Sequence, residues 1–166
     1  MKEISPFEIS DNVFKLIGTD WGLVSAKKSD GSYNTMTVSW GGMGVLWERN
    51  VCFIFVRRTR YTHEFIENAD TMTLSFYPES FRPALRICGS KSGRNCDKAA
   101  LAGLTPMDID GDVYFKGARL VLKLRKLYKS SLDEAHFIDR QIPDKVYPLR
   151  DFHDMYICEI EKIIAE

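Results

Sequence analysis

An arginine-rich segment, VRRTRYTHEF, carries residues suited to binding an anion. Arg57 and Arg58 end a predicted strand, and Thr59 to Thr62 open a predicted helix. A helix N-terminus offers unpaired N–H groups and partial positive charge, so arginines beside it favour an anion such as a phosphate. The same pattern also fits a solvated strand end followed by a helix cap. The segment alone does not decide between the two.

A second segment, GSKSGRNCDK, places three cationic side chains in a short loop after a predicted helix: Lys91, Arg94 and Lys98. Its two glycines let the backbone come close to a ligand, while its serines and cations can donate hydrogen bonds. The order of residues is not that of a P-loop. Taken by itself, the segment is explained equally well as a mobile surface loop.

A third segment, NTMTVSWGGMG, alternates in a way that predicts a β-strand, because successive side chains of a strand point to opposite faces. Its largely apolar face consists of Asn34, Met36, Val38 and Trp40. The other face is a row of small hydroxyls that runs into a glycine: Thr35, Thr37, Ser39 and Gly41.

This hydroxyl face has two interpretations. Cross-strand threonine pairs on an exposed face are common and mildly stabilising. Alternatively, the hydroxyls form a polar wall for a flat ligand, with Gly41 and Gly42 allowing close approach and Trp40 beside the ring. Three donor-rich segments lie within about sixty residues, and no dinucleotide GxGxxG motif is present. We therefore favour a phosphate-bearing flat cofactor outside a Rossmann fold.

The composition narrows the class of protein. A chain of 166 residues predicts one domain over residues 1–166, and 23 basic residues balance 23 acidic ones. This balance argues against nucleic-acid binding, and no apolar run is long enough to span a membrane. The N-terminus lacks the apolar stretch of a signal peptide, and the four cysteines form no CxxC pair. We expect a cytoplasmic protein with reduced thiols and no metal site.

The remaining pattern is mainly β. Strands are expected at VFKLIG, GLVSAKK, VCFIFVR, TMTLSFY, RLVLKLRKLYKSS and MYICEIEKII, with a hairpin turn at SDGS. Short helices are expected at RYTHEFIENA, RPALRICGS and DKAALAG. Many strands with a few short helices predict a β-barrel or α+β fold, and not a doubly wound sheet.

Three motifs give the sequence a family resemblance: N-x-M-T-x-S-W-G from Asn34, F-V-R-x-x-R-Y-T from Phe55 and S-G-R-x-x-D-K from Ser92. In order and spacing they resemble the flavin reductase-like, flavoredoxin-type FMN-binding family, from about Val13 through the last strand. The resemblance implies a split β-barrel, a homodimer and FMN bound near the subunit interface.

The resemblance also implies which residues bind the cofactor. Asn34, Trp40, Thr62 and Lys98 would lie near the isoalloxazine. The phosphate and ribityl chain would be held by Arg57, Arg58, Thr59, Ser92, Gly93 and Arg94. The motifs add Thr35, Met36, Thr37, Ser39, Gly41 and Tyr61 to the predicted FMN site.

Two residues stand apart from this set. His136 falls roughly where some relatives place a histidine near the flavin, and a plain surface or interface histidine is the alternative. Asn95, beside Cys96, replaces an aspartate that is frequent in the family, which makes the loop more positive.

The activity implied by the resemblance is an NAD(P)H-dependent oxidoreductase in which hydride passes from NADH or NADPH to N5 of FMN, with a small molecule or a redox partner protein as acceptor. Lys98 would stabilise negative charge on the reduced flavin. Two alternatives remain: a flavoredoxin-type electron carrier with tightly bound FMN and no nicotinamide turnover, and a flavin-free binding module on the same barrel.

Overall fold

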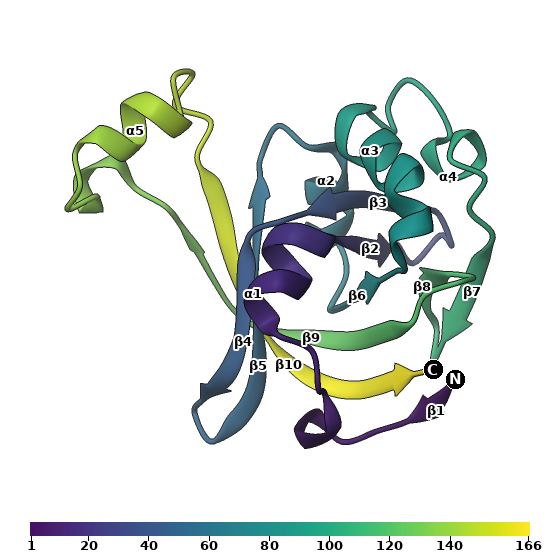
Figure 1. Cartoon of the computed structure of the whole chain (residues 1–166). Helices are drawn as coiled ribbons and strands as arrows, with labels where there is room; N and C mark the ends of the chain where they lie inside the picture. Colours follow the sequence, from purple (N-terminus) through teal and green to yellow (C-terminus); the bar gives the residue numbers. More distant parts are fainter.

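An antiparallel sheet that curls into an open barrel forms the centre of the protein, whose computed structural model describes residues 1–166 (Figure 1). The strand order is β3-β2-β6-β9-β10-β5-β4, and β1 pairs with β10. The first and last strands of this order are not paired, so the barrel is split, and the predicted fold class is confirmed. The strands are β1 (Lys2–Glu3), β2 (Gly22–Lys27), β3 (Tyr33–Val38), β4 (Gly41–Leu46), β5 (Arg49–Arg57), β6 (Thr71–Phe76), β9 (Leu120–Ser131) and β10 (His153–Ala165).

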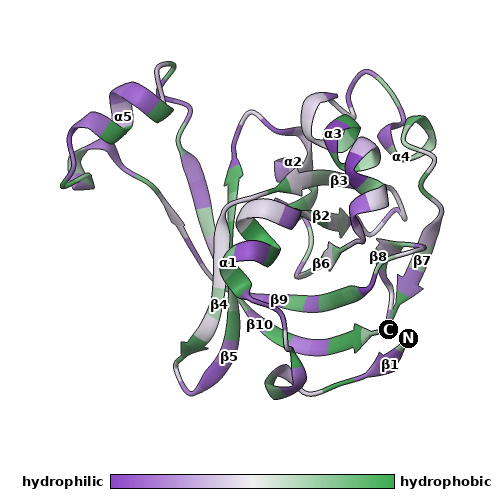
Figure 2. Cartoon of the chain, viewed as in Figure 1, coloured by the Kyte–Doolittle hydropathy of each residue, from purple (hydrophilic) through white to green (hydrophobic).

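Alternating side chains fill the inside of the barrel. On β6, Met72, Leu74 and Phe76 are buried in one cluster with the first three leucines of β9, Leu120, Leu122 and Leu124. Hydrophobic and hydrophilic residues visibly alternate along β9 and β10 (Figure 2). Because a strand repeats every two residues, one face of each strand supplies the barrel core, as the sequence predicts.

A second apolar cluster lies outside the barrel wall. It joins Leu23 and Val121, which point outward from the sheet, to Leu85 and Cys88 of the α3 helix and to Phe115. Apolar burial of this kind is what fixes short helices on a sheet. The covering elements are α3 (Arg82–Ser90), α4 (Lys98–Leu101) and the β7 (Pro106–Ile109) and β8 (Asp112–Phe115) hairpin, with α2 (Tyr61–Glu67) beside them (Figure 1).

The expected strand at VFKLIG is wrong. Residues Val13–Lys15 form α1, which continues as a π-helical turn through Leu16–Asp20. Asn12 caps this helix by accepting a hydrogen bond from the Lys15 N–H at 3.1 Å. Its apolar residues recur at i, i+3 and i+4, which is helical spacing, and Leu16 and Ile17 are buried in the barrel core.

The NTMTVSWGGMG segment forms two strands, because β3 ends at Val38 and β4 begins at Gly41. Gly41 has φ +155°, and a Cβ there would lie 2.5 Å from the carbonyl oxygen of Phe53 on β5. The neighbouring strand therefore accounts for the glycine, and its predicted place beside a ligand stays a prediction.

An arm projects from the barrel between β9 and β10 (Figure 1). It carries α5 (Gln141–Val146) and a cluster of three aromatic rings, Phe137, Tyr147 and Phe152. Ile138 and Leu149 of the arm are 98% and 84% exposed, so the arm is only partly packed in a single chain. None of the helices has the length and apolarity that crossing a membrane requires.

A buried carboxylate ties the base of the arm to the barrel. Asp154 of β10 is 1% exposed and accepts hydrogen bonds from Arg58 at 2.9 Å, His63 at 2.8 Å and Ser131 at 2.7 Å, with Lys129 at 3.2 Å. Burial alone raises the pKa of Asp154, but these donors more than offset it and hold the pKa well below its usual range. The carboxylate therefore joins α2, β9 and β10 to the turn that follows β5.

We expect Asp154→Asn to lower the free energy of unfolding by about 2 kcal/mol, measured by urea denaturation at pH 7, because it leaves the cations without their buried partner. A carboxyl with a depressed pKa stabilises the fold above its unfolded pKa and loses this effect as the pH falls. The difference in the free energy of unfolding between wild type and variant should therefore stay constant from pH 7 down to about pH 5 and shrink below about pH 4. The exposed Asp70→Asn is the control, and an equal loss in both variants would contradict this account.

Candidate functional site

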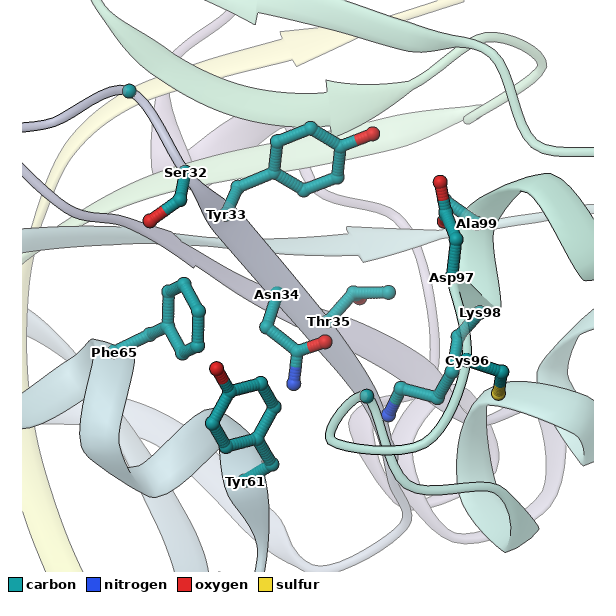
Figure 3. Close-up of a pocket in the computed structure, with 12 residues that line it drawn as sticks. Ser32, Tyr33, Asn34, Thr35, Tyr61, Phe65, Cys96, Asp97, Lys98 and Ala99 are labelled. Carbon is teal, nitrogen blue, oxygen red and sulfur yellow. The ribbon is translucent and has the colours of Figure 1, made fainter.

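The three predicted motifs meet at one cavity of about 430 Å³ (Figure 3). The β3 strand supplies Asn34 and Thr35, α2 supplies Tyr61 and Phe65, and the loop before α4 leads to Lys98. The size lies within the range of small-molecule sites. Its other lining residues are Gly31, Ser32, Tyr33, Gly93, Cys96, Asp97 and Ala99.

Asn34 is held in a fixed orientation at the centre of this cavity. Its Nδ2 donates to Thr62 Oγ1 at 2.8 Å, and both residues are buried. Gly93 packs against the other side of the amide, because a Cβ at Gly93 would lie 2.3 Å from Asn34 Oδ1 and 3.0 Å from the ring of Tyr61. The amide oxygen of Asn34 has no protein donor and faces the cavity (Figure 3).

Arg60 and Lys98 share one acceptor, the carbonyl oxygen of Cys88 in the last turns of α3. Arg60 Nη2 lies 3.4 Å from this oxygen and Lys98 Nζ lies 3.2 Å from it. Neither side chain forms a salt bridge, although Lys98 is only 4% exposed. Lys98 lines the cavity and Arg60 lies beside it, and neither pairs with a carboxylate, although Asp97 is also part of the lining.

Burial and neighbouring charge act on this pair in the same direction. Burial, followed by the charge of Arg60, lowers the pKa of Lys98 to about 8. Burial, followed by the charge of Arg57, lowers the pKa of Arg60. Both shifts mean that the charged forms lack compensation, so a bound anion would stabilise them.

The arginines predicted to hold a phosphate already have protein partners. Arg57 Nη1 pairs with Asp151 at 2.6 Å, and its Nη2 donates to the Val146 carbonyl at 3.1 Å. Arg58 Nε pairs with Asp154 at 2.9 Å. These contacts hold the arm, and the predicted role of Arg57 and Arg58 in binding a phosphate stays a prediction.

Arg94 is also engaged. Its guanidinium pairs with Glu64, donates to the Thr59 carbonyl at 3.3 Å and lies 4.9 Å from the centre of the Tyr61 ring. Ser92 accepts from the Arg94 N–H at 3.3 Å, while Thr59 is exposed. The loop is thus fastened to α2 at the edge of the cavity.

The row of hydroxyls on β3 is not an open polar wall. Thr35 Oγ1 donates to the Val24 carbonyl at 3.0 Å and accepts from Ser25 Oγ, and Thr37 Oγ1 donates to the Leu85 carbonyl. Because β2 and α3 supply these partners, both hydroxyls already bond protein groups, and their predicted contact with a ligand stays a prediction. Met36 belongs to the barrel core, so its side chain is not available to a ligand.

The remaining predicted residues lie apart from the cavity lining. Trp40 is half exposed, and its ring centre is 5.1 Å from that of His153 at the base of the arm. Ser39 precedes it and Gly41 follows it in the chain. His136 is exposed in a short turn of the arm. Their roles in binding stay predictions.

The sequence reasoning missed Arg60 as a member of the site, although it lies in a quoted motif. Three arginines occur within four residues, and their partners Asp151 and Asp154 come about ninety residues later in the chain. Only the fold shows which arginine has no carboxylate. Nothing in the sequence pattern indicated that Tyr33 and Phe65 would line the cavity.

The sequence matches the family model described as flavin reductase like domain over residues 14–165. The chain belongs to this family. Its matched segment includes all three motifs and the cavity that they form. No curated protein matches the sequence.

Solved structures confirm the fold of the family. An FMN-binding protein from Thermus thermophilus has a TM-score of 0.69 at 17% identity, covering 100% of this chain and 82% of its own. Flavoredoxin of Desulfovibrio vulgaris has a TM-score of 0.69 at 19% identity, covering 98% of this chain and 77% of its own. The styrene monooxygenase flavin reductase of Pseudomonas putida S12 has a TM-score of 0.65 at 13% identity, covering 89% of this chain and 79% of its own.

The close packing of Gly93 gives a direct test of the site's geometry. We expect Gly93→Ala to lower the free energy of unfolding by about 1–3 kcal/mol, because the new methyl group must displace Asn34 or the loop. Chemical denaturation measures this loss. Gly44→Ala, where a Cβ would meet nothing within 4 Å, is the control. If both variants are as stable as the wild type, Asn34 is not confined as described.

Proposed function

We propose that this protein binds FMN in the cavity and acts as a flavin reductase-like oxidoreductase, with NADH or NADPH as its electron donor. The observation that carries the proposal is a pair of cations without carboxylate partners: Lys98, which lines the cavity, and Arg60, which donates to the same carbonyl oxygen beside it. The family membership and the FMN-binding structural neighbours support a flavin as the ligand.

The donor set suits a phosphate-bearing flat ligand. A phosphate carries up to two negative charges, and charge-assisted hydrogen bonds from arginine and lysine are the usual way to hold it. Since Arg57 and Arg58 are neutralised by Asp151 and Asp154, we assign the phosphate to Arg60 and Lys98. This moves Lys98 from the ring, where the resemblance places it, to the phosphate.

Other residues of the cavity suit the flavin ring. The free amide oxygen of Asn34 can accept a hydrogen bond from the ring edge, and Tyr61 offers an aromatic surface. When bound, FMN supplies the hydride chemistry, and the protein supplies binding, orientation and electrostatics. The hydrogen bond from Asn34 to Thr62 fixes the amide in advance, so little ordering is required on binding.

The partly packed arm supports a homodimer. Ile138 and Leu149 are exposed apolar residues on an element that projects from the body (Figure 1). A second copy would bury this surface, as exposed apolar patches commonly do in oligomers. We also propose a cytoplasmic location with a small-molecule or protein electron acceptor.

The alternative function is an electron carrier with tightly bound FMN and no nicotinamide turnover. It is favoured by the similarity of the fold to flavoredoxin, which is as close as the similarity to the Thermus protein. The two functions use the same cavity. They differ in whether a nicotinamide nucleotide can reduce the bound flavin.

Anaerobic absorption spectroscopy tests both functions. We expect the purified protein to take up FMN and its visible flavin absorbance to bleach when NADH or NADPH is added. Bleaching by dithionite alone would support the electron carrier. A protein that neither contains flavin nor takes up added FMN would overturn the assignment.

A further inference from the structure

The side-chain amine of Lys98 has an unusual environment for a lysine. It is 4% exposed, it forms no salt bridge, and its only hydrogen bond runs to the Cys88 carbonyl at 3.2 Å. The side chain extends toward Asn34 and belongs to the lining of the cavity (Figure 3). A buried lysine normally has a carboxylate partner, and this one has none.

The neighbouring guanidinium makes the environment more unfavourable for the ammonium form. Arg60 donates to the same carbonyl oxygen at 3.4 Å, which places a second positive charge beside Lys98 Nζ. A lysine that is desolvated and next to another cation is the arrangement that activates an amine as a nucleophile, because only the uncharged form has a free lone pair.

We propose that Lys98 is a reactive amine that condenses with small anionic aldehydes entering the cavity, with Arg60 binding their negative charge. In this step the Nζ lone pair attacks the carbonyl carbon. The amine gives up two protons and the aldehyde its oxygen, which leave together as one water, and a C=N bond replaces the C=O bond. No electrons are gained or lost, so no further reactant is needed.

The geometry suits such a ligand. The cavity of about 430 Å³ has room for an aromatic aldehyde, and Tyr61, Phe65 and Tyr33 provide ring surfaces. Lys91 provides an internal comparison, because it belongs to the same loop segment but is exposed to solvent. The proposal depends on the surroundings of Lys98 and not on FMN, although FMN bound as proposed above would cover the amine.

The charged and titratable groups around Lys98 come from several elements. Burial and Arg60 favour the neutral amine, whereas Cys88 and Cys96 act in the opposite direction, and the resulting pKa is about 8. Reaction at Lys98 should therefore rise up to about pH 8, while an ordinary lysine continues to gain reactivity to above pH 10. Tyr33, Tyr61 and Asp97 also line the cavity.

Reductive labelling tests the proposal on the full chain freed of flavin. The probe is pyridoxal 5′-phosphate with cyanoborohydride, and peptide mapping by mass spectrometry measures the rate at each lysine. At pH 7 we expect Lys98 to be labelled at least about tenfold faster than Lys91, because a pKa lower by one unit gives about tenfold more free amine. With pyridoxal, which lacks the phosphate, the ratio of the labelling rate at Lys98 to that at Lys91 should be smaller. Lys98→Arg should lose the fast label and keep the slow one at Lys91.

Labelling of Lys98 that is absent, or no faster than that of Lys91, would overturn the proposal. The Arg60→Gln variant separates activation of the amine from simple access of the probe to it. We expect this variant to label Lys98 severalfold more slowly at pH 7 and to shift the pH dependence of labelling to higher pH. An unchanged pH dependence would contradict activation by Arg60. Added FMN tests the proposed function separately. Protection of Lys98 supports FMN in the cavity, whereas fast labelling unaffected by FMN supports the reactive amine and contradicts that location of FMN.

Discussion

One backbone oxygen, the carbonyl of Cys88, holds two cations that no carboxylate neutralises. Arg60 and Lys98 both donate to it, and the site depends on this convergence. The last carbonyls of a helix lack partners within the helix and carry partial negative charge, so they attract cations. The partial negative charge at a helix C-terminus is about half an elementary charge, which does not compensate the two full positive charges of Arg60 and Lys98. The remaining positive charge is the basis of our proposal that the cavity binds an anion.

The rest of the structure keeps these partners in place. The outer apolar cluster buries Leu85 and Cys88 and so fixes the end of α3 against the barrel wall. The hydrogen bond between Asn34 and Thr62 fixes the start of α2, next to Arg60. The arm takes up the other arginines, since Asp151 and Asp154 neutralise Arg57 and Arg58. The distribution of carboxylates therefore decides which of the neighbouring arginines keeps an unneutralised charge.

Local periodicity was enough to predict most of the elements and the barrel. The alternation of β6 and β9 and the helix signals around Thr62 and Pro83 are properties of neighbouring residues, and the structure has strands and helices there. The segment at Val13 failed because a short apolar run fits both periods, and packing into the barrel selected the helix. The motifs correctly pointed to one cavity. The protein partners of the β3 hydroxyls and of Arg57 and Arg58 could not be predicted, because β2, α3, Asp151 and Asp154 approach these residues only through the fold.

The central claim is that Arg60 and Lys98 bind the phosphate of FMN. Titrations of FMN and of riboflavin, which lacks the phosphate, test it in the wild type and in the Arg60→Gln/Lys98→Gln double variant. Each lost charge-assisted bond should weaken FMN about tenfold, while riboflavin affinity stays within about threefold. The exposed pair Arg86→Gln/Lys91→Gln controls for the change in net charge. A preference for FMN over riboflavin that survives in the Arg60/Lys98 variant would contradict the account.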